Sequence, residues 1–547
     1  MIIQHPKFRS LAAYMLVALL VVGSPSVLMG FAGGSARGAT IHDRSAIAVV
    51  GGPGGTRINT YNGNLFLPRV DLQIPGRGMP LEIELTYNAN QSSFSGPFGF
   101  GWRLNYGIKC LFSGSNIIVQ WGDGRNDLFI NQGGSYAPVN AGIIATLQQV
   151  GTTLQLINKD RVKFLFDASS GLLQQIQDPN GNALTFSYSG TQLTVVTDAG
   201  GRSLSLTYDA NGRVTTITDG NVSPPRTIQY SYDSLGNQVS VTDPLVNATT
   251  YAYDATHHLT AVTDALGVTR VTYGAAKMLV TGVSRFDHAD TLVSSRTFDY
   301  DVANTRTTVT DHVGGGAQAS TVYQYDANHR LVQVTDPLGH AETRAYDENG
   351  NLNAITDGSG ETTTYTYDEN GNVLTATDPL GHSTSWTYHP TLNLITSFTD
   401  GNGHSIHFTY DDNGNLISQI DGTGNVTEYT YNEFGQRISR KNARGFITNF
   451  TYDANGNRTS MTDPLGRTET VLYDGAGRKI TATDGNGRTR AFSYDAADRL
   501  IGVSFSDGTT ASYSYNAAGN LVQAVDPNTD LSLSYNAAGW PVQVVDH

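Results

Sequence analysis

A tyrosine recurs about every 21 residues along the second half of this chain, and this period constrains the fold more than any other feature. Successive gaps are 21, 21, 21, 22, 21, 21, 21, 21, 21 and 20 residues. The tyrosines that share this spacing are Tyr325, Tyr346, Tyr367, Tyr388, Tyr410, Tyr431, Tyr452, Tyr473, Tyr494, Tyr515 and Tyr535. Looser spacing upstream connects Tyr188, Tyr208, Tyr232, Tyr253, Tyr273 and Tyr300. A fixed period is typical of one supersecondary unit used many times, so we expect a repeat array over residues 172–547.

Each unit contains two strand-like runs. The run that ends at the tyrosine carries a second aromatic residue two positions earlier, as in "YTYD" (Tyr365), "WTYH" (Trp386) and "FTYD" (Phe408). Residues two apart on a strand share a face, so one face is predicted to be aromatic and the other rich in Thr and Ser. The second run, such as "NVLTATD", is aliphatic and Thr-rich. Two runs and two short turns fill about 21 residues, which predicts one β-hairpin and its link per unit.

Two kinds of turn phrase alternate along the array. In "DPLG" the Asp begins the turn, the Pro presets φ, and the Gly takes a left-handed conformation. In "DANG", "DENG" and "DDNG" the Asp side chain can accept hydrogen bonds from the backbone N–H groups of its own turn. These phrases therefore predict structural corners.

Composition favours a β-rich protein, because Tyr, Thr, Val and Phe recur in short bursts between Gly, Asn, Asp and Pro, and it argues against several other classes. An apolar fraction of 39% argues against global disorder. The formal net charge is −14, from 34 basic and 48 acidic residues, and no Lys/Arg cluster is present. Such a chain is a poor nucleic-acid binder and lacks a polybasic membrane patch. We therefore expect no nucleic-acid partner, and no membrane contact beyond a possible N-terminal anchor.

The N-terminus has the layout of an export signal. Lys7 and Arg9 precede the apolar run "LAAYMLVALLVVG", and small residues follow it. We expect residues 1–39 to be a signal peptide cleaved near Ala36 or Ala39, which would make the protein secreted or cell-surface. The run is short for a membrane span, which needs about 20 apolar residues, and an uncleaved anchor is the alternative. Residues 40–171 lack the period but are strand-rich, which predicts a separate N-terminal β-rich domain.

The repeated "YDxxGN" and "TDPLG" phrases resemble the YD repeat of the Rhs (rearrangement hotspot) family. Wall-associated bacterial repeat proteins, insecticidal toxin-complex cocoon components and teneurins share this repeat. Residues 60–107, "TYNGNLFLPRVDLQIPGRGMPLEIELTYNANQSSFSGPFGFGWRLNYG", resemble the segment that precedes the repeats in secreted members. The resemblance implies a long antiparallel strip of hairpins that curls into an open or partial hollow shell.

In full-length toxin members of this family the shell encloses a variable toxin, which catalytic aspartates in a core motif cut free. Neither the core motif nor a non-repetitive toxin domain is found in this sequence, so no catalytic residue is carried over. The expectation is a shell segment or truncated copy, or a shell completed by another chain, that encases or presents a polypeptide cargo. A stand-alone surface adhesin or carbohydrate-binding protein is the alternative, because aromatic β surfaces can stack on sugars.

No catalytic, cofactor-binding or metal-binding residue is predicted. "DDNGN" at Asp411 crudely resembles a calcium loop, but an EF-hand needs a carboxylate at its twelfth position, where Gly422 stands. The copies at Asn432 and Asn516 also lose carboxylates. The 13 histidines are scattered without metal-ligand spacing or a catalytic grouping. The single cysteine, Cys110, is predicted to be a small buried residue.

Overall fold

The structure, a computed structural model, describes residues 48–140, 142–275, 279–313, 318–536 and 538–547. The predicted export signal lies outside the described residues. Strands make up 57% of the structure and helices 2%, which confirms the predicted all-β class. The helical elements that the described part contains are three short 3₁₀ turns, η1 (Pro53–Gly55), η2 (Ala89–Gln91) and η3 (Val302–Asn304).

Two sheets account for nearly all strands. The N-terminal sheet has the order β1-β2-β3-β4-β7, formed by β1 (Val49–Gly51), β2 (Arg57–Asn59), β3 (Leu65–Ile74), β4 (Leu81–Asn88) and β7 (Trp102–Leu104). A small hairpin of β5 (Ser95–Gly96) and β6 (Gly99–Phe100) lies between β4 and β7 in the sequence. The second sheet, here called the strip, contains 42 strands from β8 to β49.

The strip begins well before the tyrosine period becomes regular. Its first strands are β8 (Lys109–Ser113), β9 (Asn116–Gln120), β10 (Asn126–Asn131), β11 (Ser135–Pro138), β12 (Ala145–Val150), β13 (Thr153–Asn158), β14 (Lys163–Asp167), β15 (Leu173–Gln177), β16 (Ala183–Ser189), β17 (Gln192–Thr197), β18 (Ser203–Tyr208), β19 (Val214–Asp219), β20 (Arg226–Tyr232), β21 (Gln238–Thr242), β22 (Ala248–Tyr253), β23 (Leu259–Asp264), β24 (Gly267–Tyr273), β25 (Val280–Phe286), β26 (Leu292–Asp301), β27 (Arg306–Val313) and β28 (Gln318–Tyr325). The boundary predicted between residues 171 and 172 stays a prediction from periodicity, while the sheet itself begins at Lys109.

The regular repeats form the rest of the strip. Their strands are β29 (Leu331–Thr335), β30 (Ala341–Tyr346), β31 (Leu352–Thr356), β32 (Thr362–Tyr367), β33 (Val373–Thr377), β34 (Ser383–Tyr388), β35 (Ile395–Thr399), β36 (Ser405–Tyr410), β37 (Leu416–Ile420), β38 (Val426–Tyr431), β39 (Arg437–Lys441), β40 (Ile447–Tyr452), β41 (Arg458–Thr462), β42 (Thr468–Tyr473), β43 (Lys479–Thr483), β44 (Thr489–Tyr494), β45 (Leu500–Phe505), β46 (Thr510–Tyr515), β47 (Leu521–Asp526), β48 (Thr529–Tyr535) and β49 (Pro541–Asp546). As predicted, every second strand ends at a periodic tyrosine.

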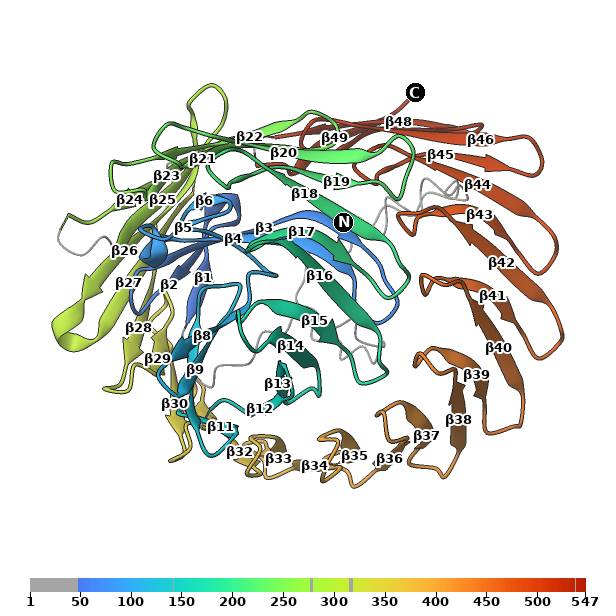
Figure 1. The fold of residues 1–547 in the computed structure, drawn as a ribbon, viewed down its shortest axis with the longest axis horizontal. Helices are drawn as coiled ribbons and strands as arrows, with labels where there is room; N and C mark the ends of the chain where they lie inside the picture. The colour runs from blue at the N-terminus through green and yellow to red at the C-terminus, as the bar shows by residue number, and fades with distance from the viewer. Residues whose placement is uncertain (1–47, 141, 276–278, 314–317, 537) are drawn as a thin grey trace.

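Each strand of the strip pairs antiparallel with its neighbours in sequence, and no ladder in the described residues joins β8 to β49. The strip instead winds past its own start. In Figure 1 it runs from the teal strands β12–β17 through green and yellow to orange, and the red strands β45–β49 return beside the green strands β18–β22. We call β8–β24 the first coil and β30–β49 the second coil. The predicted curling of a hairpin strip is confirmed.

Most of the periodic tyrosines tie their unit to the unit before it. The strand pairing shifts just before the tyrosine: Ala345 pairs with Ala354, but Tyr346 pairs with Leu352. The hydroxyl of Tyr367 then donates to the carbonyl oxygen of Leu352 at 2.6 Å. The same bond, from a tyrosine to the first residue of an earlier strand, recurs from Tyr188 to Tyr535. The tyrosine therefore bridges consecutive hairpins as well as packing on one face.

The turn aspartates act as corner pieces, as predicted. In the turn after Tyr452, Asp453 Oδ1 accepts from the backbone N–H groups of Asn455 and Asn457 at 3.0 and 2.9 Å. Its Oδ2 accepts from the Asn457 side chain at 3.0 Å. Gly456 has φ +91°, a left-handed conformation that favours glycine. We call the turn after each periodic tyrosine a Tyr-Asp turn, and the turn that leads to the next unit a link turn.

Candidate functional site: the inner face of the strip and the seam between its coils

The N-terminal sheet lies inside the curve of the strip and identifies which face of the strip is the inner one (Figure 1). The Tyr230 hydroxyl on β20 donates to Asp71 Oδ2 on β3 at 2.7 Å. Tyr251, at the equivalent place on β22, contacts Arg69. Both tyrosines stand two residues before a periodic tyrosine. The aromatic positions of the repeat therefore face inward, and the Thr/Ser positions face outward.

A buried charge cluster joins the N-terminal sheet to this inner face. Arg69 forms an ion pair with Asp71 at 2.6 Å and lies over the Trp102 ring at 4.7 Å. Burial alone would lower the pKa of Arg69, but the adjacent Asp71 carboxylate raises it, so the guanidinium stays charged. Burial raises the pKa of Tyr230 well above its ordinary value. A buried ion pair with hydrogen-bonded partners fixes one geometry, here the seat of the N-terminal sheet.

The inner face changes character along the strip. In the first coil its residues are buried with the N-terminal sheet in one core that extends to Val309. On β32–β38 of the second coil the equivalent positions are half-buried: Tyr365, Trp386, Phe408 and Tyr429. Further along the same coil, Phe450 and Tyr513 are buried. Trp386 and Phe398 contact each other, with ring centroids 5.8 Å apart, across neighbouring strands. Strands β32–β38 thus present a half-buried aromatic wall, whereas β45–β47 hold a small core of their own around Tyr513.

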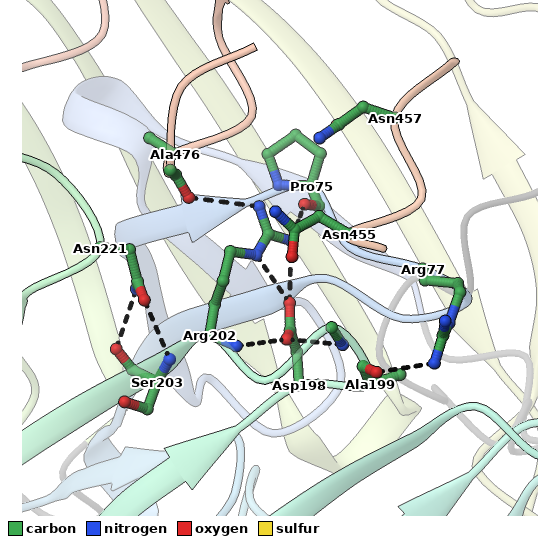
Figure 2. Close-up of polar contacts among 12 residues, drawn as sticks. Pro75, Arg77, Asp198, Ala199, Arg202, Ser203, Asn221, Asn455, Asn457 and Ala476 are labelled. Carbon is green, nitrogen blue, oxygen red and sulfur yellow. Dashed lines mark hydrogen bonds and ion pairs between the residues drawn. The ribbon is translucent and has the colours of Figure 1, made fainter. Parts of the chain in front are cut away.

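The two coils meet along a line of turns that we call the seam. There the link turns of the first coil lie against Tyr-Asp turns of the second. Figure 2 shows its centre, where Asp198 and Arg202 form an ion pair at 2.8 Å with side chains 0% and 6% exposed. Arg202 also donates to the carbonyl oxygens of Pro75, in the β3–β4 loop, and of Gly475 in the second coil, the latter at 3.4 Å. One guanidinium thereby joins the N-terminal sheet and both coils.

The seam repeats this arrangement on either side of Arg202. Arg77 donates to the Ala199 carbonyl at 2.7 Å and lies 3.8 Å from the centre of the Phe434 ring (Figure 2 shows the first contact). Further contacts join side chains of first-coil turns to second-coil turns: Lys159 to the Asn370 carbonyl (3.2 Å), Arg161 to the Asn413 carbonyl (2.7 Å), Asn182 to the Phe434 carbonyl (3.0 Å), Asn180 to the Asn415 side chain (2.9 Å) and Arg226 to the Asp498 carboxylate (2.5 Å).

The residues considered as candidate metal ligands or catalytic groups take part in local structural contacts. Asp411 Oδ1 accepts from the N–H groups of Asn413 and Asn415 at 3.0 and 2.8 Å, so its oxygens already serve the turn. His340 and His382 each contact the Asp of their own turn at 2.9 Å. Cys110 is buried as predicted, and burial raises the pKa of its thiol to about 12.

The described residues hold no group of three or more His, Cys, Asp or Glu side chains placed to hold a metal ion. No helix among them has the length and apolar character that crossing a membrane requires.

Neither the seam nor the Arg69–Asp71 cluster was predicted from the sequence. Arg202 and Asn182 are the fifth residues of ordinary link turns, and the repeat contains many similar residues that no coil covers. The β3–β4 loop "PGRGM" carries turn residues but no mark of its partner Phe434, which lies far along the chain. Only the winding of the strip brings these residues together, so a local pattern could not have revealed them.

Family models match most of the chain. The RHS Repeat model matches residues 189–221, 232–269, 253–289, 473–510, 494–531 and 515–546. The Teneurin YD-shell model matches residues 284–484, and a domain of unknown function, DUF6531, matches residues 55–129.

Three curated relatives match part of the chain, two of them over 265 residues. The tRNA3(Ser)-specific nuclease WapA of Bacillus spizizenii is 28% identical over 265 residues, which is 40% of this chain and 11% of that protein. The tRNA nuclease WapA of Bacillus subtilis matches to the same extent. The match thus spans about a tenth of the length of these two relatives.

Solved structures with a similar course of the chain include TcdB2-TccC3 without its hypervariable C-terminal region, with TM-score 0.43 and 13% identity over 89% of this chain and 32% of that one. A Photorhabdus luminescens Tc holotoxin pore has TM-score 0.34 and 13% identity over 88% and 32%. Family assignment rests on the repeat matches, whose segments follow the same hairpin units that the strip displays. The chain belongs to the Rhs (YD-repeat) family.

Proposed function

We propose that the strip is the wall of a hollow shell that encloses or presents a polypeptide cargo. The observation that carries this proposal is the change along the inner face, from a packed core in the first coil to a half-buried aromatic wall on β32–β38 of the second. A contiguous surface of partly exposed aromatic side chains is typical of a binding surface. Toxin-associated relatives and the YD-shell match are consistent with a polypeptide as the occupant.

The two faces of the strip carry different side chains, and this difference favours an enclosed cargo over a ligand bound on the outside. On the outer face Thr366 and Thr375 pair through their hydroxyls at 2.6 Å, and Thr430 pairs with Ser439 in the same way. The large aromatic side chains point inward, where an external glycan surface would not meet them. Carbohydrate binding remains the alternative, and retention of the folded protein on immobilised glycans would support it.

We further propose that the protein is exported and has no enzymatic activity of its own. The signal-like residues 1–39 are the basis for proposing export. Determining the N-terminal residue of protein recovered outside the cell tests it. We expect that protein to begin just after Ala36 or Ala39. An intact N-terminus on membrane-bound protein would favour the anchor instead. The nuclease names of the relatives describe those longer proteins, and this chain's proposed part is the wall.

Cysteine accessibility tests the hollow shell directly. Thr384 and Thr387 lie on the same strand, β34, on the inner and outer face respectively. Thr384→Cys and Thr387→Cys would each be treated with a small maleimide and with a polyethylene-glycol maleimide of several kilodaltons. Buried Cys110 serves as the unreactive internal control.

We expect the outer cysteine to react with both reagents. The inner one should react readily with the small reagent and much more slowly with the large one, because the wall restricts access. Equal behaviour of the two positions would contradict an enclosed inner face. Slow reaction of the inner cysteine with both reagents would instead indicate a packed core.

A further inference from the structure

The seam covers the link turns of the first coil but leaves those of the second coil bare. We call these bare turns the rim; they are residues 336–340, 357–361, 378–382, 400–404, 421–425, 442–446, 463–467 and 484–488. In the covered turns at Asp178 and Asp198 the fifth residues, Asn182 and Arg202, are buried. The fifth residue of a rim turn is exposed, as are His382 and Arg488. The rim therefore continues an interface whose other side is missing there.

Rim turns have the local geometry that the seam uses. Arg467 and Arg488 pair through Nε with the Asp of their own turn at 2.6 and 2.8 Å, and Arg202 does so at 2.9 Å. The remaining nitrogen of Arg202 reaches the Gly475 carbonyl of the covering turn. No covering turn lies beside Arg467 or Arg488 in the described part of the chain. These guanidinium groups are thus held in place for an acceptor that a covering turn would supply.

Exposed leucines mark the same bare surface. The third residue of the covered link turn at Asp264 is Leu266, which is half-buried and lies close to Gly539 of the second coil. In the rim the same position holds Leu338, Leu380 and Leu465, which are 81%, 79% and 77% exposed. Large apolar side chains repeated on one edge are unusual on a free surface and typical of an interaction site.

The opposite edge of the strip offers the complementary surface. We call this edge the row. It comprises three Tyr-Asp turns of the first coil and two Tyr-Asp turns that come after it in the sequence: residues 209–213, 233–237, 254–258, 326–330 and 347–351. The N-terminal segment contacts some of these turns at their fourth residue: Phe100 stacks on His257 at 3.6 Å and Tyr61 on His329 at 4.4 Å. Their second and third residues are exposed in all five turns. In the seam, carbonyls at those two positions accept the bonds from link turns.

We propose that the rim of one molecule binds the row of a second copy of this chain, through the same turn-on-turn contacts that form the seam. The rim supplies guanidinium donors and leucines. The row supplies backbone carbonyls and Leu235, which is 62% exposed. Because the two surfaces differ and lie on opposite edges, the contact is heterologous and does not close on itself. Copies would therefore stack head to tail in an open series. This proposal does not depend on the presence of a cargo.

Complementation between two variants of the full chain tests the proposal. The rim variant carries Leu338→Asp and Leu380→Asp, and the row variant carries Leu235→Asp. All three leucines are exposed, so folding should be unaffected, and circular dichroism would verify it. Thr366→Asp, on the exposed outer face, is the control that should associate like the wild type. Sedimentation velocity over the micromolar range reports the species formed.

We expect the wild type to form a series of species that lengthens with concentration, and each variant alone to stay monomeric. An equimolar mixture of the two variants should form dimers and nothing larger, since it holds one intact rim and one intact row per pair. A wild type that stays monomeric would overturn the proposal. So would a mixture without dimers, or variants that associate as the wild type does.

Discussion

Replacing a periodic tyrosine by phenylalanine should loosen the strip locally, and strand β32 offers a matched pair of positions for this test. The Tyr367 hydroxyl donates to the Leu352 carbonyl at 2.6 Å, and burial raises its pKa. Tyr365, two residues earlier on the same face, has no hydrogen bond from its hydroxyl to the described residues. Tyr367→Phe therefore removes a bond between two hairpins, and Tyr365→Phe removes an oxygen that makes none.

The expected magnitude follows from the cost of one hydrogen bond. A typical intramolecular bond contributes about 0.5–1.5 kcal/mol, which is about a 2- to 13-fold change in a local opening equilibrium. The total free energy of unfolding is a poor measure here, because repeat arrays do not unfold in one step. Local amide exchange measured by mass spectrometry on peptides from β31 to β33 is the appropriate assay.

Tyr367→Phe should accelerate exchange in these peptides by that factor, while Tyr365→Phe should leave the rates close to wild type. The same acceleration in both variants would show that ring packing, and not the hydroxyl, holds the hairpins together. No acceleration in either would refute the view that the periodic tyrosine bridges consecutive units.

Three further predictions concern the turns. Arg202→Ala should open the seam at a cost of roughly 3–5 kcal/mol, because it leaves the buried Asp198 carboxylate without its ion-pair partner. Arg488→Ala removes an exposed ion pair and should cost under about 1 kcal/mol. Amide exchange in the second-coil turns measures both effects. Gly456→Ala should destabilise its turn far more than Gly381→Ala does, because an added Cβ at Gly456 would lie 2.8 Å from a backbone atom of the β3–β4 loop, although both glycines have φ near +90°; amide exchange in the two turns compares them. Hydrogen bonds lower the pKa of Asp421 to about 2, so its contribution to stability is complete above its unfolded value of about 3.9 and is lost as pH falls through about 2; Asp421→Asn should remove this pH dependence from exchange in its turn.

Much of the local structure followed from the sequence because the repeat unit is self-contained. Alternation of aromatic and hydroxyl residues sets the face of each strand, and Asp and Gly set each corner within five residues. Asp453 and Tyr367 therefore have the surroundings expected from their neighbours in the sequence. These interactions are short-range, so a single sequence is enough to predict them.

The arrangement of the coils did not follow from the sequence, because the same turn phrase occurs in two environments. The link turn of Arg202 is buried in the seam and that of Arg488 is exposed, although both pair with their own Asp in the same way. The two link turns differ because one lies where the second coil meets the first and the other does not. The number of strands in one full turn of the strip decides which turns meet. Curvature accumulated over many strands sets that number, together with the β3–β4 loop inserted at the seam.

The radius of gyration in solution tests the central claim, that the strip winds on itself around an inner space. A flat strip of 42 strands would be about 200 Å long at roughly 4.8 Å per strand, with a radius of gyration near 60 Å. A compact chain of this length has a radius of gyration of about 24 Å, and a hollow wound strip should lie slightly above it. Small-angle X-ray scattering of the monomer should give about 25–30 Å. A value near 60 Å would contradict the winding, and with it the seam and the inner wall.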